Sequence, residues 1–178
     1  ALLDLSGNRL ARLRAHTFRD LISLEVLNLA RNRFAGGDGA FAHGTFLGLD
    51  SLRQLLVDAA QLRVLGPAGC FAGMPVNLAE LDLANNRIER IEPDAFKGLM
   101  QLRHLSLANN QVNTLLVADD EDQEGSTATT ITTSLLAGLY DLDTLDLSAN
   151  RLDAIAESTF VGLARLRKLL LNANGIHS

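Results

Sequence analysis

The sequence predicts a single repeat domain in which seven short strands, one per coil, stack into a solenoid around a leucine core. Three observations predict it: a strand-like leucine motif occurs seven times, an asparagine recurs in register with it, and a phenylalanine recurs later in most repeats. Repetition at a fixed period of about 20–50 residues is typical of solenoids, whose units bury apolar residues only against their neighbours. No unit is therefore expected to fold alone.

The strand motif has the form LxxLxLxxNxL. Alternate side chains of a strand point to the same face, so both leucines of the LxL part face the core and the residues around them face outward. Each buried leucine contributes roughly 1.5–3 kcal/mol to folding. The motif occupies residues 2–10, 24–34, 52–62, 78–88, 102–112, 142–152 and 166–176.

Two further columns are in register with the strands. The asparagine amide both donates and accepts hydrogen bonds, so it can satisfy backbone groups of the tight turn that follows each strand. Its column reads Asn8, Asn32, Ala60, Asn86, Asn110, Asn150 and Asn174, with spacings of 24, 28, 26, 24, 40 and 24 residues. The rear column, which fills the wider part of the core, reads Phe18, Phe46, Phe71, Phe96, Leu136 and Phe160.

These columns resemble the leucine-rich repeat family, in the 24-residue subtype LxxLxLxxNxLxxLxxxxFxxLxx of many extracellular receptors and matrix proteins. The resemblance covers residues 1–178. It implies an α/β-type solenoid of about seven repeats, with a curved parallel sheet on the concave face and short turns or 3-10 segments on the convex face. It also implies a non-enzymatic module for protein–protein recognition, similar to Toll-like receptor ectodomains or to adhesion and matrix proteins, at the cell surface or outside the cell.

Composition narrows the choice of partner. Sixteen basic against 21 acidic residues give a net charge of −5, which repels phosphate backbones, so we expect a protein ligand and no nucleic acid. No apolar stretch is long enough to insert into a membrane. Hydrolase, nucleotide-binding and zinc motifs are missing from the sequence, so we expect no enzyme activity and no cofactor. Cys70, beside Phe71, is interpreted as an inert core thiol.

The ends of the sequence leave a second interpretation open. Neither end carries a polar or cysteine-bearing cap, although solenoids need caps to cover the open core. We therefore expect an internal piece of a longer array, with apolar end coils. The same feature suits an intracellular scaffold component that packs permanently against a neighbouring subunit.

The third repeat departs from the pattern, because Ala60 takes the asparagine position. Loss of the amide is expected to leave turn groups without a partner, at a cost of about 1–3 kcal/mol, unless water or Asp58 compensates. The repeat is therefore predicted to be distorted.

Outward strand positions supply the first candidate site. Asp58, Glu80 and Asp82 form an acidic patch in the middle of the expected sheet, with His104 beside it. Aspartate is common at this position of the repeat, so a structural role for Asp4, Asp82 and Asp146 stays open. Aromatic side chains, which usually dominate binding energy, are missing from these positions. The candidate ligand-binding residues are Asp58, Glu80, Asp82, His104, Asp146 and Lys168.

Two insertions supply the second candidate site. They lie near residues 35–44 and 118–134, and both leave the coil between the asparagine and the rear column, so we expect both on one flank. Long loops on a rigid scaffold often carry binding residues. The acidic loop partly matches a calcium loop but has Ile131 where a glutamate ligand belongs, so no metal site is expected. The candidate flank contacts are Asp38, His43, Asp119, Asp120, Glu121, Asp122 and Glu124.

Overall fold

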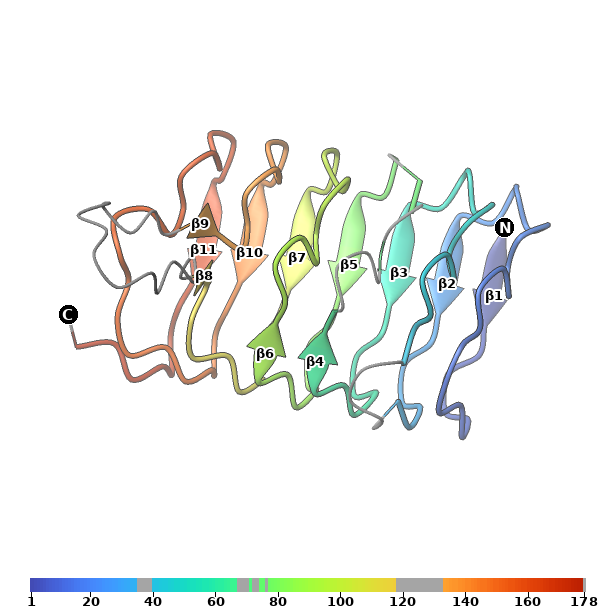
Figure 1. The fold of residues 1–178 in the computed structure, drawn as a ribbon, viewed down its shortest axis with the longest axis horizontal. Helices are drawn as coiled ribbons and strands as arrows, with labels where there is room; N and C mark the ends of the chain where they lie inside the picture. The colour runs from blue at the N-terminus through green and yellow to red at the C-terminus, as the bar shows by residue number, and fades with distance from the viewer. Residues whose placement is uncertain (35–39, 67–70, 72–73, 76, 118–132, 178) are drawn as a thin grey trace, which may run out of the picture.

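The computed structural model describes residues 1–34, 40–66, 71, 74–75, 77–117 and 133–177. Its main feature is a seven-stranded parallel sheet in which each repeat contributes one strand beside that of the preceding repeat (Figure 1). In sheet order the strands are β1 (Leu2–Asp4), β2 (Val26–Asn28), β3 (Gln54–Leu56), β5 (Glu80–Asp82), β7 (His104–Ser106), β10 (Thr144–Asp146) and β11 (Lys168–Leu170).

The strand register confirms the predicted motif. Each strand pairs with its neighbour at equivalent positions, so the central leucines form one row across the sheet. Leu27, Leu55, Leu81 and Leu145 in this row are fully buried. Leu169 in the last strand is 37% exposed, because a coil covers it on one side only.

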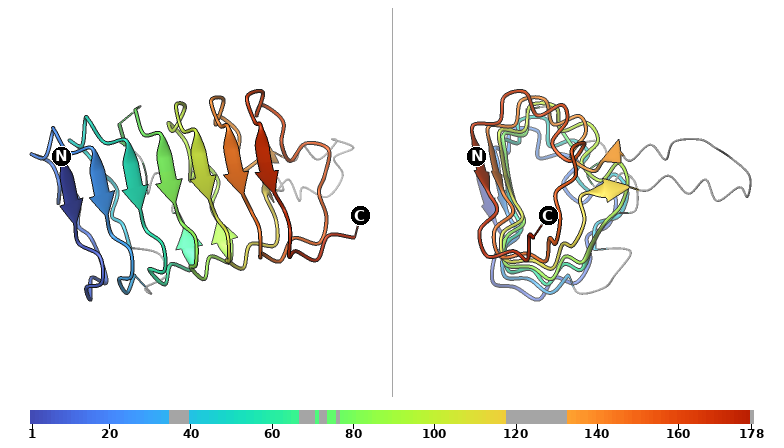
Figure 2. Two further views of the ribbon diagram at one scale, coloured as in Figure 1. Left: turned by 180° about the vertical axis from the view of Figure 1, so that it is seen from behind. Right: turned by 90° about the vertical axis from the view of Figure 1, so that its left-hand side faces the viewer.

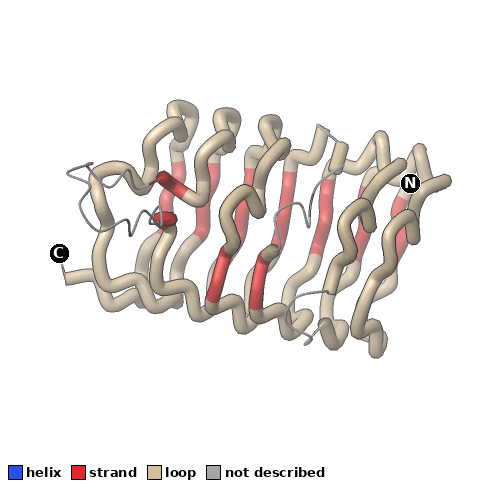
Figure 3. The backbone as a smooth tube through the Cα atoms, viewed as in Figure 1, coloured by secondary structure: helices blue, strands red, loops and turns tan. Residues whose placement is uncertain are grey.

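The rear of the coil lies opposite the sheet and consists mainly of turns (Figure 2). Two short ribbons interrupt the turns: β4 (Val64–Leu65) pairs in parallel with β6 (Arg90–Ile91), and β8 (Leu116–Val117) pairs antiparallel with β9 (Thr133–Ser134). Within the described ranges there is neither an α-helix nor a 3-10 helix (Figure 3). Turns, and not 3-10 segments, therefore form the convex side there.

The phenylalanine column stacks behind the leucines as predicted. Neighbouring ring centroids lie 6.4 Å apart for Phe18 and Phe46, 6.0 Å for Phe46 and Phe71, and 6.4 Å for Phe71 and Phe96. Leu136 then takes the place of the next ring and is fully buried. The aromatic stack therefore ends at the fourth repeat, and a smaller side chain continues the core.

Each asparagine of the column after Asn8 joins two coils. The Asn86 Nδ2 donates to the carbonyls of Leu83 and Ala84 in its own turn, at 2.9 and 3.1 Å, and to that of Val57 in the preceding coil, at 2.8 Å. Its Oδ1 accepts the N–H of Leu62 at 3.0 Å. Asparagines that likewise bond both their own turn and the preceding coil are Asn32, Asn110, Asn150 and Asn174.

The turn that holds these amides needs a left-handed residue immediately before each asparagine position. All seven such residues have φ between 50° and 67°, although six are not glycine. Left-handed backbone costs a non-glycine residue of order 1–3 kcal/mol, which the surrounding hydrogen bonds must offset. The column consists of Gly7, Arg31, Ala59, Asn85, Asn109, Ala149 and Ala173.

The third repeat replaces its missing asparagine in an unexpected way. The N–H of Phe34 donates to the carbonyl of Ala60 at 2.9 Å, where other repeats use an asparagine oxygen. The N–H of Ala60 donates to Oδ1 of Asn86 at 2.9 Å, and Gln61 adopts a φ of 65°. Neighbouring coils thus supply partners for these groups of the third repeat, where the sequence had suggested Asp58 or water.

Replacing Asn86 with alanine tests the ladder. It removes a buried amide that serves both its own turn and the preceding coil, so we expect a loss of roughly 3–5 kcal/mol in unfolding free energy. The matched control is Asn8→Ala: Asn8 is exposed and bonds only its own turn, through Leu5 and Ser6. That variant should lose about 1 kcal/mol or less. Equal losses in urea unfolding would contradict a role for the amide between coils.

Two glycines in equivalent turns test how closely the coils approach. Gly48 and Gly98 have φ of 89° and 92°, so alanine meets the same backbone strain at both. A Cβ at Gly48 would collide with the carbonyl oxygen of Arg19, whereas a Cβ at Gly98 meets open space. We expect Gly48→Ala to lose about 1–3 kcal/mol more than Gly98→Ala in thermal or urea unfolding. Similar losses of stability in the two variants would show that backbone strain, and not the close approach of the coils, determines the effect.

Candidate functional site on the sheet face

A shallow pocket of about 180 Å³ lies on the outer face of β5, β7, β10 and β11. Side chains alternate along each strand, so the outward positions of adjacent strands face the same side. The buried Leu81 and Leu105 lie beneath it. Five of the six sheet-face residues proposed from the sequence line this pocket: Glu80, Asp82, His104, Asp146 and Lys168.

The sixth residue, Asp58, does not line the pocket, but its negative charge acts on Asp82. Burial raises the pKa of Asp82 above its ordinary value of 3.8, and repulsion from Asp58, Glu80 and Asp146 raises it further. The N–H of Ala84, which donates to this carboxylate, acts in the opposite direction. Burial and the neighbouring carboxylates therefore disfavour the charged form of Asp82, and a nearby cation favours it.

Two of the acidic residues also accept hydrogen bonds that stabilise the turns after their strands. Asp82 Oδ1 accepts the N–H of Ala84 at 2.9 Å, and Asp146 Oδ1 accepts the N–H of Ser148 at 2.9 Å. Asn28 accepts the N–H of Ala30 at the equivalent position of the second repeat. The structural interpretation of these aspartates is therefore correct. Because the turn bonds use Oδ1, the roles in the turn and in the pocket are compatible.

Glu80 is tied to the neighbouring strand, since Gln54 Nε2 donates to its Oε2 at 2.9 Å. This bond positions the carboxylate across two coils without neutralising it. His104 and Lys168 are exposed on β7 and β11. The pocket therefore carries three carboxylates together with one amine and one imidazole at its edges.

The flank residues are largely outside the part of the chain that the structure describes. His43 is described, and it is exposed on the turn that precedes Phe46. The remaining flank residues, and Cys70, lie outside the described residues: Asp38, Asp119, Asp120, Glu121, Asp122 and Glu124. Their role as contacts stays a prediction.

The root of the second insertion is described and is firmly anchored. Leu116 and Val117 pair with Ser134 and Thr133, and the Ser134 hydroxyl donates to the carbonyl of Thr159 in the next repeat at 2.6 Å. This ribbon lies at the rear of the coil (Figure 2). The second insertion is therefore rooted at the rear of the coil, on the convex side.

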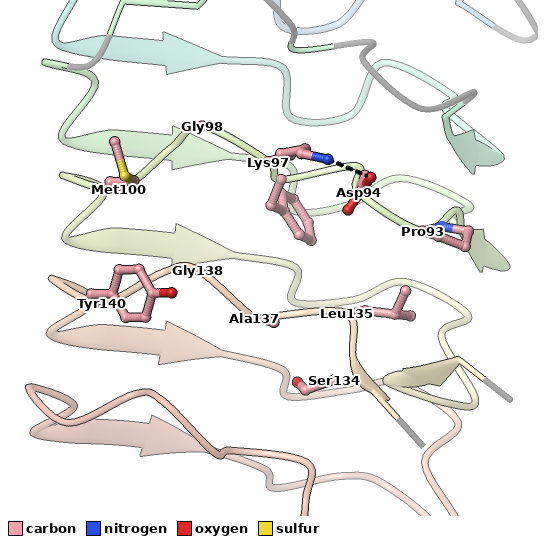
Figure 4. Close-up of a pocket in the computed structure, with 11 residues that line it drawn as sticks. Pro93, Asp94, Lys97, Gly98, Met100, Ser134, Leu135, Ala137, Gly138 and Tyr140 are labelled. Carbon is pink, nitrogen blue, oxygen red and sulfur yellow. Dashed lines mark hydrogen bonds and ion pairs between the residues drawn. The ribbon is translucent and has the colours of Figure 1, made fainter. Parts of the chain in front are cut away.

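Sequence reasoning missed two further hollows. A pocket of about 380 Å³ lies between the turns that precede β7 and β10, with Met100 and Tyr140 side by side where the strands begin (Figure 4). A charged groove adjoins it, lined by arginines and aspartates of the last three coils. The exposed apolar residues at Ile22, Met100 and Tyr140, which all lie four positions after the rear column, were the signal available in the sequence.

The described residues contain neither a membrane-spanning helix nor a cluster of metal ligands. No helix there is long and apolar enough to span a bilayer. No group of three or more histidine, cysteine, aspartate or glutamate side chains there is arranged to hold a metal ion.

Comparison with known proteins defines the class. A profile of the leucine-rich repeat family matches residues 1–62, 76–116 and 124–176, which is most of the chain. The chain therefore belongs to the leucine-rich repeat family.

The relatives are extracellular-type members of this family, of the matrix and receptor kinds. Podocan-like protein 1 of Mus musculus is 33% identical over 176 residues, which cover 89% of this chain and 29% of the relative. Toll-like receptor 8 of Homo sapiens is 28% identical over 194 residues, which cover 97% of this chain and 18% of the receptor. The chain thus spans less than a third of the length of either relative.

Solved structures show the same architecture. The TLR13–ssRNA13 complex matches with a TM-score of 0.70 and 26% identity, over 97% of this chain and 26% of that chain. The Toll–Spatzle complex of Drosophila matches with a TM-score of 0.78 and 24% identity, over 98% of this chain and 22% of that chain. The second likeness shows the fold alone.

Replacing Asp82 with asparagine tests the electrostatics. Asparagine keeps the turn bond, as Asn28 shows, and removes the charge. Because the folded pKa of Asp82 lies above its unfolded value of 3.8, its charge destabilises the fold above the folded pKa and costs nothing below 3.8. We therefore expect Asp82→Asn to raise the melting temperature at about pH 7 and to leave it unchanged at about pH 3.

The matched control for this variant is Asp4→Asn in the first coil. Asp4 is exposed, and hydrogen bonds from Ser6 lower its pKa. Its charge therefore stabilises the fold above the unfolded pKa, and its removal should lower the melting temperature at neutral pH. The same sign for both variants would overturn this account of the cluster.

Proposed function

We propose that this chain is a non-enzymatic recognition module whose sheet face binds a basic segment of a protein ligand. The observation that carries the proposal is the convergence of Glu80, Asp82 and Asp146 on one pocket, where burial and repulsion from these neighbours and from Asp58 raise the pKa of Asp82. A lysine or arginine side chain placed among them relieves this repulsion. The attraction of the cation to several carboxylates at once offsets their mutual repulsion and supplies the electrostatic part of binding.

The shape of the pocket suits a long basic side chain. Its apolar part is the half-buried Leu170, an outward residue of β11, and its acidic part is formed by Glu80, Asp82 and Asp146. The methylene stem of a lysine or arginine covers apolar surface and its charged end reaches the carboxylates. Lys168, at the opposite edge of the pocket from Glu80, disfavours a second cation there and so orients the incoming segment.

Relatives support a binding role without deciding the ligand. The fold carries a protein in the Toll–Spatzle complex and a single-stranded RNA in the TLR13–ssRNA13 complex. For this chain we favour a protein, because the net charge of −5 and the acidic pocket both repel a phosphate backbone. Its relatives support a place outside the cell or at its surface.

The test uses a short synthetic peptide with two lysines separated by one leucine, labelled for fluorescence anisotropy. We expect Glu80→Gln and Asp146→Asn each to weaken binding about tenfold, equal to roughly 1.4 kcal/mol, and added salt to weaken it further. Asp153→Asn is the matched control, because Asp153 is exposed on the part of the coil that follows the strand and does not line the pocket.

Two results would contradict the proposal. One is equal affinity for a peptide that carries glutamates in place of the lysines, or for a single-stranded RNA of similar length. The other is equal affinity of the Glu80→Gln and Asp146→Asn variants and the unmodified chain.

A further inference from the structure

We infer that this protein has a second interaction surface, at the edge where the strands of the last three coils begin. We call it the entry edge and define it by Met100, Arg103, Tyr140, Asp141, Arg165 and Arg167. It fits a protein segment in which an aromatic or large apolar side chain is followed by acidic residues. This surface adjoins the acidic pocket at His104 and selects the opposite charge.

The apolar half of the entry edge is the pocket between the turns that precede β7 and β10. It measures about 380 Å³, and the buried ring of Phe96 contributes to its wall. Met100 and Tyr140 stand on neighbouring turns at its open end, 50% and 58% exposed (Figure 4). An exposed ion pair between Lys97 and Asp94, at 2.9 Å, lies farther along the turn that carries Met100 (Figure 4).

The two turns that form the pocket have open space beside their glycines. In the first two coils the turns approach so closely that a Cβ on Gly48 would strike the backbone of Arg19. A Cβ on Gly98 or on Gly138 would meet nothing within 4 Å. The opening coincides with the repeat in which Leu136 replaces the rear phenylalanine, so a smaller side chain lies in the core behind it. The space left at the surface accommodates a side chain from another molecule.

The charged half is the groove on the other side of the same turn. Arg165 Nη1 pairs with Asp141 Oδ1 at 2.9 Å, and Arg167 Nε pairs with Asp143 Oδ1 at 3.4 Å. Arg103 occupies the position equivalent to Asp143 and Arg167 in the preceding coil and lines the same groove. Three arginines against two aspartates leave a local excess of positive charge in a chain whose net charge is −5.

The two halves are continuous, because Tyr140 lines the apolar pocket and Asp141, the next residue, lines the charged groove. A partner segment that places an aromatic ring between Met100 and Tyr140 therefore places its following residues over the arginines. Tyrosine, methionine and arginine are the residue types that interfaces favour, and tyrosine and arginine contribute most to hot spots. The chain has a single tyrosine, and it stands at this junction.

Charge distribution favours an acidic protein segment over a nucleic acid. Asp141 and Asp143 lie between the arginines and repel a continuous row of phosphates. A single carboxylate can take the place of one aspartate in a bidentate contact with an arginine, because carboxylate and guanidinium geometries match. The segment therefore offers separate acidic side chains and not a uniform anionic backbone.

The experiment titrates the protein with a short synthetic peptide in which one phenylalanine is followed by two glutamates, and follows backbone amide shifts by NMR. We expect the shifts to cluster at Tyr140 and Arg165, and Tyr140→Ala to weaken binding about tenfold. Tyr140→Phe should lose less than threefold, because it keeps the ring. Arg165→Gln combined with Arg167→Gln, both on exposed side chains, provides an independent test and should weaken binding about tenfold.

Matched controls lie elsewhere on the same scaffold. Ile22→Ala removes an exposed apolar side chain from the position equivalent to Tyr140 in the first coil, and Arg151→Gln removes an exposed arginine from the opposite edge. Both should leave affinity within twofold. A peptide with alanine in place of the phenylalanine, or lysines in place of the glutamates, should bind at least fivefold more weakly.

Three outcomes would overturn the inference: tighter binding of a single-stranded RNA than of the peptide, equal affinity for the lysine peptide, or full affinity in the Tyr140→Ala variant. None of these outcomes depends on the acidic pocket, because the peptide used here carries the opposite charge.

Discussion

The structure depends on one repeated interaction, the bonding of an asparagine amide to two consecutive coils. Leucine burial supplies most of the driving force but is not directional, so it does not fix how one coil sits on the next. The asparagine supplies that direction: Asn86 bonds carbonyls of its own turn and also binds Val57 and Leu62 of the preceding coil. This geometry requires a left-handed backbone conformation at the residue before each asparagine, which is energetically unfavourable for residues other than glycine. Where Ala60 interrupts the ladder, backbone groups and Asn86 of the next repeat take over.

The common register of the strands also explains how side chains of the proposed binding pocket come together. Because all strands pair at equivalent positions, outward side chains of different coils form rows across the sheet. Residues up to 88 positions apart in the sequence, such as Glu80 and Lys168, therefore line one pocket. The acidic pocket shares atoms with the scaffold: Asp82 and Asp146 each use one carboxylate oxygen to hold a turn. Such a site needs no flexible loop, and its geometry is fixed before a ligand arrives, which lowers the entropic cost of binding.

Much of the fold could be predicted from the sequence, because leucine and asparagine recur as residue types. The seven strands and the rows of Leu27, Leu55 and Leu81 follow from the motif. The same reasoning brought five candidate residues to one pocket, since outward positions depend only on strand alternation. It missed the left-handed column, where glycine, arginine, alanine and asparagine all occur, so that no residue type marks it. It also missed the entry edge, because the spacing of coils at Gly98 and Gly138 depends on packing and not on any motif.

The acidic pocket and the charged groove meet at His104, which lines both. The sheet face carries a cluster of carboxylates around Asp82, and the edge where the strands begin carries an arginine-rich groove. The sign of the surface charge therefore changes along the length of one short strand. Two neighbouring surfaces of opposite sign create a local dipole, and a dipole orients a ligand more strongly than either charge alone, because the reversed orientation places like charges together on both sides. In the recognition role that we propose for this scaffold with few aromatic residues, such opposed charges, together with the ring of Tyr140, supply the selectivity that a large apolar patch supplies in other proteins.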